Sequence, residues 1–160
     1  MNKVVKMRTL KTLLDFVAWI VSVLLQIVGG LVGGYIMFAE GYGSLVYMWF
    51  GMTISVFLVG SLSILFRPAI TPKNYILRLG LVAMGTALPL IIFYFPPLFF
   101  YNADYETPPE FPFLATITGV ICFYILGKLT AKLSYLKIAK VIGYGCSILI
   151  LSVGLYALWD

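Results

Sequence analysis

Polar and small residues at helical spacing in an early apolar segment are the first residues of this chain that could do chemistry. The segment runs from Leu13 to Phe38, and at 100° per residue its polar and small side chains fall on one narrow face. Bulky apolar side chains cover the opposite face. Because Gln26 would lose its hydrogen bonds in lipid, the polar face must meet protein or water. We call this polar face the stripe; it includes Glu40, just beyond the segment. Its residues are Asp15, Ala18, Ser22, Gln26, Gly29, Gly33 and Glu40.

Two interpretations of the stripe remain open. The favoured one is a packing seam, because Gly29-x-x-x-Gly33 and Gly30-x-x-x-Gly34 are overlapping motifs that let helices approach closely. Gln26 would then bond to a neighbouring helix. The alternative is a lined pathway with Asp15 and Glu40 at its two mouths and Gln26 at its waist. Neither acid is deep in the segment, so neither resembles a mid-membrane proton or sodium carrier.

An acidic segment later in the chain offers a second possible site. Asp104, Glu106 and Glu110 stand among tyrosines and prolines and could bind a cation or a basic partner. The spacing is not that of an EF-hand, so calcium ligation is not indicated. We expect a solvated outer loop.

Basic residues form a third group. Their side chains could engage lipid phosphates or an acidic partner at the inner membrane surface through charge-assisted bonds. They stand in short clusters between apolar runs, which indicates membrane orientation rather than nucleic-acid binding. Beyond the N-terminal cluster, this inner basic group consists of Arg67, Lys73, Arg78, Lys128, Lys132, Lys137 and Lys140.

Histidine is absent from the sequence, which removes the most frequent metal ligand and the usual general base. We expect no metal site, no cofactor and no catalytic residue. A membrane hydrolase would need a nucleophile with a base or paired carboxylates, and nothing marks the acidic segment as such. The sequence therefore argues against an enzyme.

The composition determines the solvent in which these residues act. Of 160 residues, 62% are hydrophobic and only 11% are charged, and the mean hydropathy is +1.03. A soluble domain carries about 25% charged residues. The chain must therefore dissolve in lipid, as one domain over residues 1–160.

Five apolar segments have about the 20 residues needed to cross the hydrocarbon, and we predict an all-α, five-span bundle. Placing the N-terminus inside puts all eleven basic residues on the inner side, while the outer pieces carry only acidic residues. The C-terminus is then outside. The first segment is too long for a signal peptide, and we expect it to be retained. The predicted spans are residues 13–38, 45–66, 75–95, 113–131 and 141–159, the third ending at Pro96-Pro97.

Small residues also share faces of the later spans, which predicts close packing throughout, with the first helix at the centre of the bundle. Gly80 and Ala83 mark the face of the third span, and Gly143, Ser147 and Gly154 mark that of the fifth.

Three functions fit the sequence. The first is a non-enzymatic subunit or assembly component of a membrane complex, with the lipid bilayer and other membrane subunits or further copies of itself as partners. The second is a small oligomeric transporter or channel that uses the stripe. The third is a lipid-active enzyme with an outer acidic site. In a prokaryote the location would be the cytoplasmic membrane.

Overall fold

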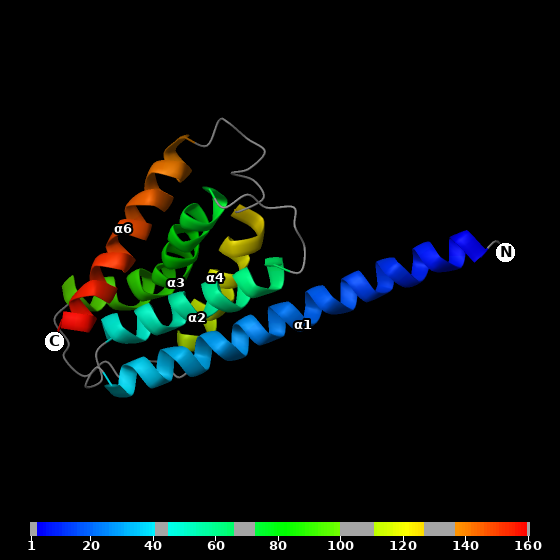
Figure 1. Cartoon of the computed structure of the whole chain (residues 1–160). Helices are drawn as coiled ribbons and strands as arrows, with labels where there is room; N and C mark the ends of the chain where they lie inside the picture. Colours follow the sequence, from blue (N-terminus) through cyan, green and yellow to red (C-terminus); the bar gives the residue numbers. More distant parts are fainter. Residues whose placement is uncertain (1–2, 41–44, 66–72, 100–110, 127–136, 160) are drawn as a thin grey trace.

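The computed structural model describes residues 3–40, 45–65, 73–99, 111–126 and 137–159, and all of these residues are helical. No strand occurs among them (Figure 1). The helices are α1 (Lys3–Glu40), α2 (Leu45–Leu65), α3 (Lys73–Phe99), α4 (Phe111–Ile121) with the π-helix η1 (Cys122–Leu126), and α6 (Lys137–Trp159).

Three of these helices are long and apolar enough to cross a membrane, so the chain has the character of a membrane protein. Their apolar stretches are Met7–Glu40, Leu45–Leu62 and Tyr75–Ile92. Two further apolar helices are shorter, Phe111–Ile125 and Lys140–Tyr156.

One predicted boundary was wrong. Helix α3 does not stop before Pro96-Pro97 but continues to Phe99. Proline removes one backbone donor, but its fixed φ of about −65° is that of a helix, and here the two prolines lie in the last turn. Helix α1 begins at Lys3 and includes the basic segment that precedes the first predicted span.

The glycines of α1 form a tight seam with α2. Gly33 and Gly51 bring the two backbones into contact, and a β-carbon on Gly34 would lie 2.5 Å from Cγ of Met52. A β-carbon on Gly30 would lie 2.7 Å from Cγ2 of Val56. The small-residue motifs thus set the approach of the first two helices, as the packing interpretation predicts.

Helix α3, and not α1, lies at the centre of the bundle. It contacts α2, α4 with η1, and α6. Hydroxyls join these helices: Thr53 Oγ1 lies 2.7 Å from Thr86 Oγ1, and Thr118 donates to the Gly85 carbonyl at 2.6 Å. Ser147 of α6 donates to the Ile76 carbonyl at 2.6 Å. The expectation of a central first helix was wrong because half of α1 makes few contacts.

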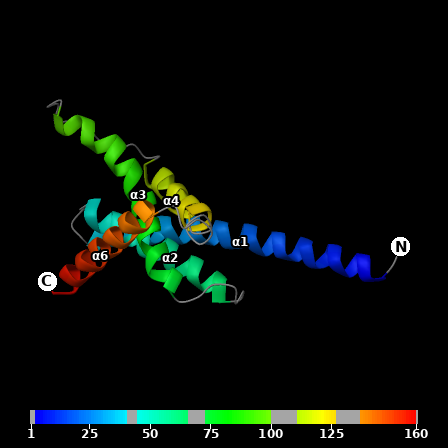
Figure 2. The ribbon, with the colours of Figure 1, turned by 90° about the horizontal axis from the view of Figure 1, so that it is seen from above.

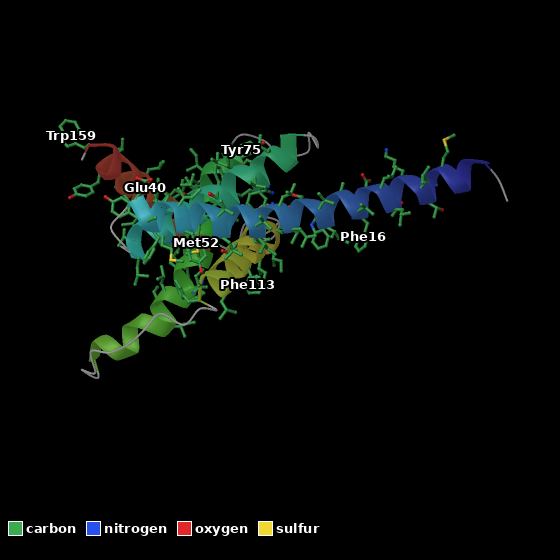
Figure 3. All side chains as sticks on the ribbon, turned by 90° about the horizontal axis from the view of Figure 1, so that it is seen from below. Phe16, Glu40, Met52, Tyr75, Phe113 and Trp159 are labelled. Carbon is green, nitrogen blue, oxygen red and sulfur yellow. The ribbon has the colours of Figure 1, made fainter. Side chains whose placement is uncertain are left out.

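The N-terminal half of α1 extends beyond the other helices in both views (Figures 1 and 2). Every residue from 7 to 21 is exposed, and burial begins at Ser22. In Figure 3 the labelled Phe16 stands on the projecting part, whereas Met52 lies among the packed helices. The α1 helix therefore has a packed C-terminal half and an exposed N-terminal half.

The crossing of α3 and α6 leads to a first prediction. A β-carbon on Gly80 would collide with the backbone carbonyl of Gly143, whereas one on Gly145 of α6 would meet nothing within 4 Å. We expect Gly80→Ala to lower the free energy of unfolding by about 1–3 kcal/mol, the usual cost of overpacking. Gly145→Ala, the matched control, should leave it unchanged or slightly raised. Unfolding in mixed micelles of dodecyl maltoside and dodecyl sulfate measures both, and equal effects would contradict this packing.

Candidate functional site

The polar part of the α1 stripe meets the π-helix η1. Gln26, which is fully buried, donates from Nε2 to the phenol oxygen of Tyr124 at 2.8 Å. Ser22 Oγ lies 3.0 Å from the same oxygen and 3.5 Å from Gln26 Nε2. Trp19 covers this group with its ring edge, at 6.1 Å between its ring centroid and that of Tyr124. The buried Nε2 of Gln26 therefore has hydrogen-bond partners, as buried polar groups normally do.

The π-helix directs two adjacent aromatic rings to different neighbours. A π-helix is a local widening of an α-helix that is often found at functional sites. Tyr124 reaches α1, while Phe123, fully buried, lies against Gly60 of α2. The two rings are nearly perpendicular, with centroids 5.1 Å apart. A β-carbon on Gly60 would lie 2.6 Å from Phe123 and 2.9 Å from Gln26 Nε2, so a glycine is needed here.

A buried guanidinium lies above the same phenyl ring. Arg78 of α3 is only 6% exposed, and its Cζ is 5.1 Å from the centroid of Phe123. A desolvated cation–π contact of this kind contributes about 2 kcal/mol. Among the described residues, the phenols of Tyr75 and Tyr124 lie near Arg78, and a phenol is neutral at physiological pH. Desolvating an ion costs several kcal/mol, so the cation–π contact alone does not balance the burial.

Three buried side-chain atoms of the described residues lack a hydrogen-bond partner: Gln26 Oε1, Ser61 Oγ and Arg78 Nε. Ser61 follows Gly60, which touches both Gln26 and Phe123. We call Ser22, Gln26, Ser61, Arg78 and Tyr124 the polar layer. Buried donors and acceptors are normally satisfied, so a group of unsatisfied atoms at one level of a bundle is the candidate functional site.

The structure divides the predicted stripe into two parts. Ser22 and Gln26 join the polar layer, while Gly29 lies against Val59 and Gly33 against Ser55 of α2. These contacts favour a packing seam over a lined pathway between Ser22 and Gly33. Asp15 and Glu40 are exposed on α1, Asp15 about two turns before Ser22 and Glu40 at the C-terminal end of the helix.

The basic and acidic groups are only partly described. Arg78 enters the polar layer, Lys137 is exposed and Lys140 is half-buried at the start of α6. Lys73 is the first residue of α3, and nothing is described of its side chain. Other predicted site residues lie outside the described ranges: Arg67, Asp104, Glu106, Glu110, Lys128 and Lys132.

Tyr124, Phe123 and Ser61 were missed by the sequence analysis. A tyrosine within an apolar run is an available signal, because its hydroxyl must find a partner when buried. The sequence does not say which partner. That choice depends on the π-helix, whose position no residue pattern in this segment marks.

Comparison with known protein families, with curated proteins and with solved structures finds no match to this chain. The site therefore has to be judged on its own chemistry. No group of three or more His, Cys, Asp or Glu residues stands together in the described part of the chain. The layer offers instead one cation, three hydroxyl-bearing side chains and an amide, which are groups that can hold a ligand.

The bond between Gln26 and Tyr124 gives a second prediction. In a double-mutant cycle of Gln26→Met and Tyr124→Phe, we expect a coupling energy of about 0.6 kcal/mol and at most about 1.7 kcal/mol, the range for such bonds between membrane helices. Thr118→Val with Tyr124→Phe is the control pair, because Thr118 bonds to Gly85 instead. That pair should be additive within about 0.5 kcal/mol. The same micelle unfolding assay measures both cycles, and additivity of the first pair would contradict the bond.

Proposed function

We propose that this protein is a non-enzymatic subunit of a membrane assembly. In this proposal the exposed N-terminal half of α1, residues 7–21, binds another membrane protein. One observation carries this proposal: residues 7–21 are all exposed, although they continue the stripe that α2 and η1 cover from Ser22 onward. The same helix face is thus covered along one half and open along the other.

The character of the open face indicates what would cover it. At helical spacing, Arg8, Lys11, Asp15 and Ala18 follow the stripe, while Leu13, Val17 and Ile20 occupy the opposite side. Lipid suits the apolar side. The stripe side combines charges with a small residue, which suits a second helix that comes close at Ala18 and carries polar groups near Lys11 and Asp15. We therefore name a helix of a different membrane protein as the partner.

In this proposal the chain crosses the membrane five times, with its N-terminus inside and its C-terminus outside, in the cytoplasmic membrane if the source is prokaryotic. The positions of the helix ends support it. In Figures 1 and 3 the end of α1 and the end of α6 lie on the same side, as helices that both end outside must.

Position-specific photocrosslinking tests the partner. With benzoylphenylalanine at position 18, on the stripe, we expect a covalent product with a protein other than this chain in native membranes. The matched control is the same group at position 13, which is also exposed (58%) but lies on the apolar side and should give mainly lipid products. A product of two copies of this chain would contradict this proposal and favour the oligomeric transporter. Equal protein products at both positions would also contradict it.

Side-specific labelling tests the topology. In a chain with Cys122 and Cys146 replaced by Ala, single cysteines at Glu40 and Lys137, both exposed, should react with an impermeant maleimide from opposite sides. Glu40→Cys should be labelled in intact cells and Lys137→Cys only after the membrane is opened. Labelling of both from one side would overturn the five-span arrangement while leaving the crosslinking result interpretable.

A further inference from the structure

We infer that the polar layer binds a phosphate group at the inner membrane surface, with Arg78 as its anchoring cation. This binding uses the packed part of the bundle, whereas the partner contact uses the exposed residues 7–21 of α1. Its placement at the inner surface rests on the proposed topology. The observation behind it is a buried guanidinium whose Nε donor has no hydrogen-bond partner and whose only described electrostatic neighbours are phenols.

An anionic ligand would balance the charge of Arg78 in the layer. Arg78 is 94% removed from solvent, and a guanidinium stays charged in proteins. The carboxylates in the described part of the chain, Asp15 and Glu40, are exposed residues of α1 that do not belong to the layer. A buried cation without a paired carboxylate is stabilised when an anionic ligand supplies the missing charge.

The hydrogen-bonding groups indicate the type of anion. Arg78 offers a planar fork of donors, which matches phosphate oxygens in geometry. The hydroxyl of Ser61 can donate as well, and its oxygen also lacks a partner. Gln26 Oε1 is an unsatisfied acceptor, so a hydroxyl or ammonium group next to the phosphate, or a bound water, would complete the layer.

The depth of Arg78 along its own helix matches that of the phosphates of a bilayer. Arg78 lies three residues after Tyr75, where the apolar stretch of α3 begins, or about 4.5 Å along the helix. The headgroup region starts at the edge of the hydrocarbon, within reach of an arginine side chain. Tyr75 and Tyr124 are residues of the type that prefers this interface. A lipid phosphate or a free phosphate can both present this chemistry.

Thermal unfolding of the purified, delipidated full-length chain in dodecyl maltoside tests the inference with three probes. These are phosphatidylglycerol, inorganic phosphate, and dioleoylglycerol as a phosphate-free lipid. We expect phosphatidylglycerol to raise Tm in a concentration-dependent way, as a ligand of the folded state must. Dioleoylglycerol should raise it much less. A response to inorganic phosphate alone assigns a free phosphate as the source, and a response to the lipid alone assigns a headgroup.

Arg78→Gln identifies the anchoring residue, with Lys137→Gln as the matched control because Lys137 is an exposed cation of α6. Loss of charge-assisted bonds should weaken phosphate binding about 10- to 100-fold in Arg78→Gln. Lys137→Gln should bind as the wild type does. If Arg78→Gln does not fold, Arg78→Lys replaces it, since it keeps the charge but lacks the planar fork and should bind about tenfold more weakly.

The readout separates binding from packing, because it is the ligand-induced shift in Tm and not Tm itself. A purely structural Arg78 would lower Tm in the variant yet leave the shift intact, and that result overturns the inference. Equal shifts with dioleoylglycerol and phosphatidylglycerol, or no shift with any probe in the wild type, overturn it as well.

Discussion

The structure depends on one constraint of the bilayer: a polar group inside an apolar bundle must find its partner within the protein. In lipid no water replaces a missing hydrogen bond, so each unsatisfied group is costly. Gln26 meets this requirement through Tyr124, and Thr53 through Thr86. These bonds join α1 to η1 and α2 to α3, and they determine which helices become neighbours.

Small residues make those bonds possible by controlling distance. Gly33 and Gly51 bring α1 against α2, Gly60 leaves room for Phe123, and Gly80 allows α6 to cross α3. Dispersion contacts fall off steeply with separation, and without a hydrophobic driving force between helices in lipid they must be close. The central place of α3 follows, because it carries small residues toward both α4 and α6.

The polar layer does not obey the constraint completely. Arg78 rests on Phe123 and still has an unpartnered Nε, and it shares its surroundings with unsatisfied atoms of Gln26 and Ser61. A region that breaks the rule followed by the rest of the molecule is where a ligand would have the largest effect on stability. The exposed N-terminal half of α1 is a different exception, since its patterned helix face is not covered by the other described helices. The unsatisfied polar layer is the basis of the phosphate proposal, and the exposed helix face is the basis of the partner proposal.

The sequence by itself determined the solvent of this protein, its all-helical class and the spacing of its polar stripe, because hydropathy and a period of 3.6 residues are local properties. It also offered a packing seam as one of two interpretations of Gln26 and the glycines of α1. Only the tertiary structure decided that Tyr124 is the partner of Gln26, that α3 is central, and that Arg78 is buried on Phe123. These facts depend on contacts between residues far apart in the chain and on the π-helix that turns Phe123 and Tyr124 to different neighbours. Local patterns carry no information about such pairings.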